Sequence, residues 1–187
     1  VYGDYGGAWV DETRQVRPPT SRARPRLAAE GAVRWLGRVA GMRASILRIP
    51  GIYAPDREGG TPRERLLRAT PALRAEDDVY TSHIHADDLA RACVAALFRA
   101  RPQRVVNVSD DTELKMGDYF DLAADLYGLP RPPRIARSEA QEHLTPQLLS
   151  FMGESRRLVN RRLKDELRVV LRHPTVGTGL LEDERPR

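Results

Sequence analysis

Cysteine, lysine, aromatic residues and long hydrophobic runs are scarce in this sequence, and these shortages argue against several classes of structure and partner. Cys93 is the only cysteine among 187 residues, so no disulfide can form within the chain, and we expect a reducing, cytoplasmic environment. No apolar run approaches the ~20 residues that span a membrane. Aromatic residues make up 6% of the chain and do not alternate with basic residues, as they do on surfaces that stack nucleobases. We therefore expect no membrane partner and no nucleic-acid partner.

The positive charge of the chain is almost entirely arginine. The net charge is +5 and the isoelectric point is near 9.8, but only two of the 31 basic residues are lysines. Alanine, proline and glycine are also plentiful, and this joint bias is typical of a GC-rich coding sequence. Acidic residues lie among the arginines throughout the chain. A basic nucleic-acid-binding module is therefore the least favoured interpretation.

The segment from residue 44 to residue 55 is the predicted central strand around which the other elements are placed. Its first half is a short apolar run that fits a strand buried on both faces. Pro50 should end the hydrogen-bonding ladder because it has no N–H to donate, and Gly51 permits a sharp turn. In open α/β sheets, ligands bind at the carboxyl edge that such a strand reaches. The alternative is an ordinary buried strand that ends in a Pro-Gly turn.

The remaining segments alternate between helix and strand, which is typical of an α/β fold. Hydrophobic spacing predicts helices at 24–39, 62–69, 86–99, 117–127, 138–143 and 146–171, extended segments at 79–85 and 105–108, and a long loop at 3–20. The first helix should bury a face made of Ala28, Ala32, Trp35, Leu36 and Val39. The helix at 86–99 should bury Leu89, Ala92, Cys93, Ala96 and Leu97. Because two or three strands are too few for an independent parallel sheet, we expect a portion of the protein before Val1 to supply the rest.

His83 and His85 lie on the same face of an extended segment, directly before a helix. Two histidines at this spacing can bind a metal, but no third ligand with a recognisable spacing accompanies them, so we expect no metal site. We favour a structural role in which one imidazole makes a hydrogen bond that fixes the strand-to-helix turn. Asp87 and Asp88 are either catalytic carboxylates or a helix-start pair, and the second interpretation is favoured.

No other pattern in the sequence points to a particular reaction. The glycines at positions 3, 6 and 7 lack the strand-turn-helix spacing of a phosphate-binding loop, and no serine lies in a G-x-S-x-G motif. Cys93 falls within the apolar pattern of its helix and is expected to pack in the core. The residues by themselves therefore predict an α/β fold and leave the chemistry open.

Six segments, in order along the chain, match a known series of motifs. They are VYG at 1–3, LAAE at 27–30, LRIPGIYAP at 47–55, IHADDLA at 84–90, VNV at 106–108 and RLKDEL at 162–167. The series resembles the C-terminal half of the extended short-chain dehydrogenase/reductase family, the NAD-dependent epimerase/dehydratase group. Each match is weak alone, but together they cover nearly the whole chain.

The resemblance implies an α/β fold made of the C-terminal part of a Rossmann-type parallel sheet and a small, mostly helical substrate lobe. The N-terminal, nucleotide-binding half would lie before residue 1. Residues 1–109 would belong to the Rossmann-like domain, with 53–85 partly in the substrate lobe. Residues 110–181 would form the lobe itself, and 182–187 a tail.

The same resemblance places two arginines where the family has its catalytic tyrosine and lysine. Arg22 takes the position of the tyrosine and Arg26 that of the lysine. Arg26 can still supply positive charge and a hydrogen bond to a ribose, but a guanidinium is always protonated and cannot replace a phenol as an acid or base. Tyr2 or Tyr5 would have to reach the site instead.

The implied cofactor is NAD or NADP, and the implied partner is a small molecule such as a nucleotide sugar or another carbonyl or hydroxyl compound. The cofactor would be contacted by Arg26, Pro50, Gly51 and Ile52, and the substrate by Tyr53, Arg57, Tyr80, His83 and His85. A homodimer is also implied. Two functions stay open at this point: an NAD(P)-dependent oxidoreductase or nucleotide-sugar epimerase-like enzyme, and a catalytically degenerate sensor or scaffold that binds a dinucleotide.

Overall fold

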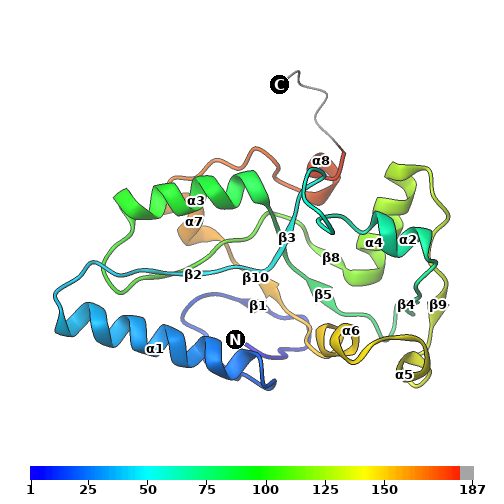
Figure 1. The fold of residues 1–187 in the computed structure, drawn as a ribbon, viewed down its shortest axis with the longest axis horizontal. Helices are drawn as coiled ribbons and strands as arrows, with labels where there is room; N and C mark the ends of the chain where they lie inside the picture. The colour runs from blue at the N-terminus through cyan, green and yellow to red at the C-terminus, as the bar shows by residue number, and fades with distance from the viewer. Residues whose placement is uncertain (182–187) are drawn as a thin grey trace.

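Two short parallel ladders lie at the centre of the molecule. The computed structural model describes residues 1–181 and shows an α/β fold with mostly parallel strand pairs (Figure 1). Strand β2 (Ile46–Arg48) pairs in parallel with β7 (Val105–Asn107), and β3 (Gly51–Tyr53) pairs in parallel with β6 (His83–His85). The predicted parallel strand at the start of segment 44–55 is therefore confirmed.

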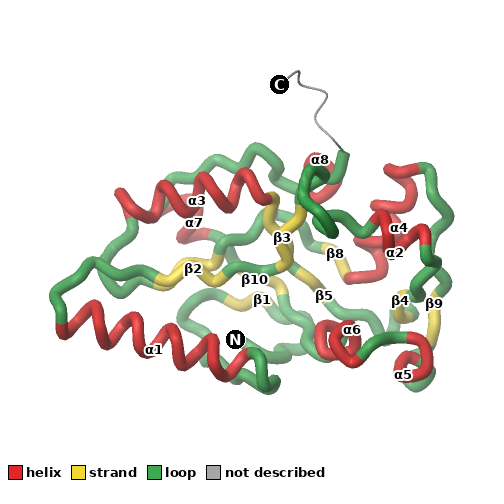
Figure 2. Tube along the Cα trace, in the orientation of Figure 1, coloured by secondary structure: helices red, strands yellow, loops and turns green. Residues whose placement is uncertain are grey.

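The helices and the other strands surround these ladders. The helices are α1 (Ala23–Val39), α2 (Arg63–Leu67), α3 (Ala86–Arg99), α4 (Met116–Tyr127), α5 (Ala140–His143), α6 (Pro146–Phe151), α7 (Arg161–Asp165) and α8 (Val176–Gly179). The remaining strands are β1 (Trp9–Val10), β4 (Ala72–Leu73), β5 (Tyr80–Thr81), β8 (Leu114–Lys115), β9 (Arg134–Ile135) and β10 (Arg157–Leu158). Figure 2 shows α1 on one side of β2 and α3 on the other. None of the helices in residues 1–181 combines the length and the apolar character that crossing a membrane requires.

Pro50 changes the pairing partner of the chain instead of turning it. Backbone bonds to β7 continue up to the Arg48 carbonyl, which accepts from the Val108 N–H at 2.9 Å. Pro50 cannot donate, and the next N–H, that of Gly51, bonds the Ser82 carbonyl next to β6 at 3.3 Å. The chain therefore runs on as β3. The expected sharp turn at Gly51 is wrong, because a residue without an N–H can end one ladder while the backbone stays extended.

Two long segments were expected to have simpler structures than they have. The loop predicted at 3–20 contains β1, and the helix predicted at 146–171 is divided into α6, β10 and α7. Strand β10 pairs with β1, so the Arg157 N–H bonds the Ala8 carbonyl and the Ser155 carbonyl accepts from Gly7, at 3.0 and 2.9 Å. These long-range bonds use the backbone groups that a continuous helix would need, and local periodicity does not reveal them.

The hydrophobic core lies mainly between α3, α7 and the central strands. Its largest fully buried residues there include Ile84, Val106 and Leu163. A second cluster joins α4 and α8 around the ring of Tyr53. The first cluster therefore packs against β6 and β7, and the second packs against β3.

The apolar face of α1 is mostly exposed, contrary to expectation. Trp35 is 59% exposed and Val39 is 66% exposed. Within the described residues β2 pairs only with β7, and a ladder of two strands is too narrow to cover a helix of this length. The helix is held instead by Glu30, whose two oxygens accept from the Arg48 guanidinium at 2.9 and 2.8 Å.

Helix α3 matches its predicted bounds, but only part of its predicted inner face is buried. Ala92 and Ala96 are buried against the central strands, whereas Cys93 and Leu97 are exposed. The prediction that Cys93 packs in the core is wrong, because the side of α3 that faces the central strands carries Ala92 and Ala96 and does not include Cys93.

Candidate functional site

The carboxyl ends of β2 and β7, where β3 and β6 begin, bring a group of polar and aromatic side chains together. Gly51 lies exposed at the start of β3, and its neighbour in the ladder is His83. A Cβ placed on Gly51 would lie 3.5 Å from the His83 ring, which is an ordinary contact. Asp110 follows β7, and its N–H bonds the His83 carbonyl at 2.7 Å. This edge of the sheet is the place where α/β folds bind their ligands.

Tyr53, His83 and Asp110 form a buried polar cluster below this edge. The Tyr53 ring meets the His83 ring edge-on at 6.4 Å, and His83 stacks on Tyr119 at 4.4 Å. The Tyr53 hydroxyl donates to the Thr175 carbonyl at 3.2 Å. Among residues 1–181, His83 Nδ1 and Asp110 Oδ2 are buried without a hydrogen-bond partner. Two buried polar atoms without a hydrogen-bond partner in one cluster are unusual, because each such atom lowers the stability of the folded state.

Burial controls the protonation of this cluster. It lowers the pKa of His83 to about 4, so the imidazole is neutral near pH 7. Burial also raises the pKa of Asp110 to about 7, although hydrogen bonds from Thr112 oppose the change. The pKa of Tyr53 is raised far above its usual value, first by burial and then by the negative charge of Asp110. Asp110 can therefore exchange a proton near neutral pH, and the other two groups cannot.

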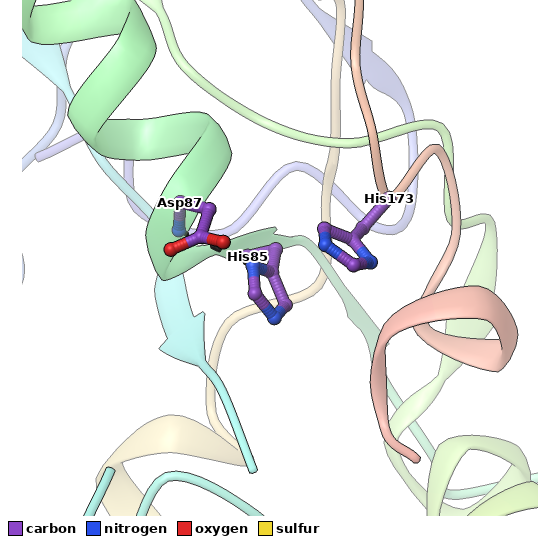
Figure 3. Close-up of side chains that lie close together, drawn as sticks. All are labelled: His85, Asp87 and His173. Atoms are coloured by element: carbon purple, nitrogen blue, oxygen red, sulfur yellow. Dashed lines mark hydrogen bonds between the residues drawn. The ribbon is translucent and has the colours of Figure 1, made fainter. Parts of the chain in front are cut away.

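His85 ends β6 and caps helix α3, as one reading of the sequence predicted. Its Nδ1 accepts from the Asp87 N–H at 3.2 Å, which satisfies one of the free N–H groups at the helix start. The His85 ring stacks on His173 with the ring centroids 3.8 Å apart. Burial, and then the proximity of His173, lower the pKa of His85. Figure 3 shows His173 reaching toward this pair from the segment before α8.

His85, Asp87 and His173 are the described residues whose ligand atoms lie close enough to consider a metal, all within 4.8 Å of one another. The cap argues against one. Because His85 Nδ1 uses its lone pair to accept from Asp87, the ring proton resides on Nε2, and neither nitrogen is free to coordinate. The two imidazoles are also stacked, at 27°, and do not converge on a point. A metal would have to break the cap of α3.

Asp88 is a structural residue. Its side chain is fully buried, and its oxygens accept from the Arg172 N–H at 2.9 Å, the His173 N–H at 2.8 Å and the Arg91 guanidinium at 3.0 Å. These bonds fix the segment that carries His173 against the start of α3. All of its bonding capacity is directed at the protein, which agrees with the helix-start interpretation and leaves little for catalysis.

Comparisons with known proteins connect this geometry to solved structures. No protein-family model and no curated protein matches the chain. A functionally unknown conserved protein from Silicibacter pomeroyi is similar, with 36% identity and a TM-score of 0.84 over 96% of this chain and 61% of that one. MoeE5 in complex with UDP-glucuronic acid and NAD has 23% identity and a TM-score of 0.72, covering 96% and 59%. UDP-glucuronic acid 4-epimerase from Bacillus cereus in complex with NAD has 16% identity and a TM-score of 0.72, covering 96% and 55%.

The chain has the fold of an extended short-chain dehydrogenase/reductase. The resemblance predicted from the six motifs is thus confirmed at the level of the fold, as is the Rossmann-type α/β class. The chain spans 55 to 61% of the length of these three structures.

The two arginines at the catalytic positions of the short-chain dehydrogenase/reductase pattern lie at the start of α1. The Arg22 guanidinium rests on the Phe151 ring, 4.5 Å from its centroid, and Nη2 donates to Ser150 Oγ at 3.4 Å. It therefore connects α1 to α6. Arg26 is exposed, one helical turn further along α1. Arg22 directly precedes α1 and Arg26 lies in its first turns, and neither offers a phenol.

The tyrosines considered as substitutes are both engaged in hydrogen bonds. Tyr2 is 2% exposed, its hydroxyl donates to Asn107 Oδ1 at 2.7 Å, and burial raises its pKa. The Arg48 guanidinium lies 4.6 Å from the Tyr2 ring. The Tyr5 hydroxyl donates to the Gln15 carbonyl. Neither hydroxyl is free to exchange a proton with a bound molecule in this arrangement.

The predicted substrate residues fall into an inner and an outer group. Tyr53, His83 and His85 are buried together. Arg57 is exposed, and its guanidinium donates to the Ile52 carbonyl at 3.1 Å. Tyr80 lies apart, with its N–H bonded to Ser155 Oγ at 3.0 Å and its ring 4.6 Å from the guanidinium of Arg157.

Asp110, Tyr119 and His173 belong to this site and were not predicted. Asp110 had a usable signal, because it directly follows the buried strand Val105–Asn107 and so had to lie at the carboxyl edge. Tyr119 lies within the helix predicted at 117–127 and was not among the predicted site residues. His173 had no signal, since its position depends on bonds between its backbone and Asp88, 85 residues away.

Proposed function

We propose that this chain forms the substrate side of an NAD(P)-dependent oxidoreductase or nucleotide-sugar epimerase-like protein. The observation that carries the proposal is the extended short-chain dehydrogenase/reductase fold over 96% of the chain, with Gly51 exposed at the carboxyl edge. Two of the similar structures hold NAD, and one of them also holds UDP-glucuronic acid. We infer a nucleotide sugar, or another compound with a carbonyl or hydroxyl group, as the substrate.

The residues present fit the nicotinamide end of a dinucleotide. Gly51 is exposed and extended, so a planar ring can approach its backbone without meeting a side chain, and Pro50 and Ile52 flank this position. When bound, NAD(P) accepts or donates a hydride. The sequence contains no glycine-rich loop to bind the pyrophosphate, so that function would fall to a part of the protein outside the 187 residues.

In this proposal the chain's own groups orient the substrate. Arg57 and Tyr80 lie on the substrate side, and Arg26 offers a positive charge toward a ribose. Tyr53 and His83 form a firm, neutral floor below Gly51, since neither is ionised at neutral pH. The boundary between a Rossmann-like part ending at residue 109 and a lobe of residues 110–181 is part of the same proposal. The homodimer and the cytoplasmic location stay predictions.

A catalytically degenerate protein that binds a dinucleotide as a sensor or scaffold is the second candidate. The specific observation in its favour is Arg22, which packs on Phe151 where the family pattern has its acid–base tyrosine. Tyr2 is bonded to Asn107 and gives no replacement. A protein of this kind would bind the cofactor and the substrate without moving a hydride between them.

Titration calorimetry and a turnover assay on the natural protein that contains this chain test both candidates. We expect NAD or NADP to bind at micromolar to millimolar concentration. Gly51→Ala should weaken binding, because a methyl group in contact with the His83 ring adds bulk to the backbone position that the nicotinamide is proposed to approach. Gly31→Ala on the open surface of α1 is the matched control. Absence of dinucleotide binding at millimolar concentration would end the proposal.

Turnover separates the two candidates. Hydride transfer to or from a nucleotide sugar by the unmodified protein supports the enzyme. Binding without turnover supports the sensor, and in that case the double variant Arg22→Tyr with Arg26→Lys should gain measurable activity.

A further inference from the structure

Helix α3 carries a second apolar face that nothing in residues 1–181 covers. Val94, Leu97 and Phe98 are 57%, 82% and 80% exposed, while Ala92 and Ala96 on the opposite face are buried in the core. Leu97 and Phe98 follow Val94 by three and four residues, so the three exposed side chains lie together on one side of α3. Contiguous exposed apolar side chains on a folded protein mark interaction surfaces.

The exposed face is one wall of a groove. The opposite wall is the non-helical segment at Arg168 and Val169, and the groove between them has a volume of about 510 Å³. Two arginines hold the walls together: the Arg91 guanidinium donates to the Val170 carbonyl at 2.7 Å, and the Arg99 guanidinium donates to the Leu167 carbonyl at 2.8 Å. The groove is therefore formed before any partner arrives, which lowers the entropic cost of binding.

The charge around the groove selects its partner. Its lining residues are Ala90, Arg91, Val94, Ala95, Phe98, Arg99, Arg168 and Val169. They include three arginines and no carboxylate, and one of the three, Arg91, is already paired with the buried carboxylate of Asp88. A second copy of this chain would bring the same three positive charges into the interface. The helix that forms the wall is also short, because its 14 residues extend only ~21 Å. One face of such a helix is far smaller than the ~800 Å² that each partner buries in a standard interface, so it is too small for a stable dimer.

We propose that this groove docks an acidic amphipathic helix of a partner protein. Apolar side chains of the partner at i and i+4 would lie against Val94 and Phe98, which with Val169 line the groove. A carboxylate beside those anchors would face Arg168, because Arg91 is already paired with Asp88. The surface is separate from the edge that carries Gly51, so the inference does not depend on the proposed function.

Fluorescence anisotropy with a labelled synthetic helix tests the proposal on the full chain. The probe is an amphipathic peptide of leucine, alanine and glutamate, longer than the ~15 residues that a helix needs in water. The matched control peptide has lysine in place of every glutamate. We expect the acidic peptide to bind, with an affinity that falls as salt is added, and the basic peptide to bind at least ~10-fold more weakly.

Two variants of the chain locate the binding surface. Phe98→Asp should weaken binding at least ~10-fold, because it places a carboxylate among the peptide's own. Arg168→Gly should reduce the salt dependence, and it should leave the fold intact because position 168 has φ of 54°, which glycine adopts freely. Leu67→Asp, at an exposed position of α2, should change nothing.

Three results would overturn the proposal. The first is equal binding of the acidic and basic peptides, and the second is unchanged binding by Phe98→Asp. The third is a dimer in sedimentation experiments that Phe98→Asp dissociates, since the occupant of the groove would then be a second copy of this chain.

Discussion

Asp110→Asn should stabilise the protein at pH 7.5 and leave its stability almost unchanged at pH 4. Burial raises the pKa of Asp110 from 3.8 to about 7 in the folded protein, while in the unfolded chain the carboxyl returns to its ordinary value. The folded state therefore binds this proton more tightly than the unfolded state does. The stabilising contribution of the proton is complete below pH 3.8 and is lost as the pH rises to about 7.

The size of the effect follows from the same two values. A difference of about 3 pH units at 1.36 kcal/mol per unit gives roughly 4 kcal/mol lost across this range. Oδ2 has no partner among the described residues that would compensate the charge, while Oδ1 accepts from the Thr112 N–H at 3.0 Å. Asparagine keeps the Oδ1 bond and the side-chain volume but does not ionise, so its stability should not fall over this interval.

Urea unfolding followed by circular dichroism, at half-unit steps from pH 4 to pH 8, measures the effect. The difference between the wild-type and variant free energies of unfolding removes contributions from other titrating groups. We expect this difference to grow with pH in favour of the variant and to level off above pH 7. Parallel curves for the two proteins would show that Asp110 titrates normally and that the buried cluster is misdescribed.

Three further predictions concern neighbouring residues. His83→Phe should make the protein more resistant to acid. Burial lowers the pKa of His83 from 6.5 to about 4, so the wild-type protein loses stability as the pH falls between these values. Urea unfolding midpoints at pH 4.5 and pH 7.5 measure this, and an equal change at both pH values would contradict the prediction. Asp88→Asn should cost about 1–3 kcal/mol in urea unfolding, since an amide NH₂ would face the N–H of Arg172 or His173, and a neutral result would refute the structural role. Glu30→Ala should cost about 3 kcal/mol by leaving the Arg48 guanidinium buried and unpaired, and recovery of stability in Glu30→Gln would show that shape matters more than charge.

The elements with strong local signals were predictable. Helix α3 was located at both ends because aspartates mark its start and apolar residues recur through its length. Strand β2 was found from its apolar run, and the hydrogen bond that fixes the turn at His85 was expected from its position before a helix. In each of these cases the residues that decide the structure lie within a few positions of one another.

The wrong predictions concern segments whose structure depends on residues far away in the sequence. The division of residues 146–171 depends on backbone bonds from Ser155 to residues near the N-terminus, and the change of partner at Pro50 depends on where β6 lies. The exposure of Trp35 follows from the small number of strands beside α1. His173 entered the candidate site through contacts that no local pattern encodes, whereas the position of Asp110 after a buried strand was a signal that was not used.

The most direct test of the central claim is a crystal structure of the natural protein that contains this chain, grown with NAD or NADP. We expect the nicotinamide ring to lie in van der Waals contact with the backbone of Gly51, which follows the carboxyl end of Ile46–Arg48 and begins the strand that pairs with His83–His85. A dinucleotide whose ring lies elsewhere, with Gly51 facing solvent, would contradict it.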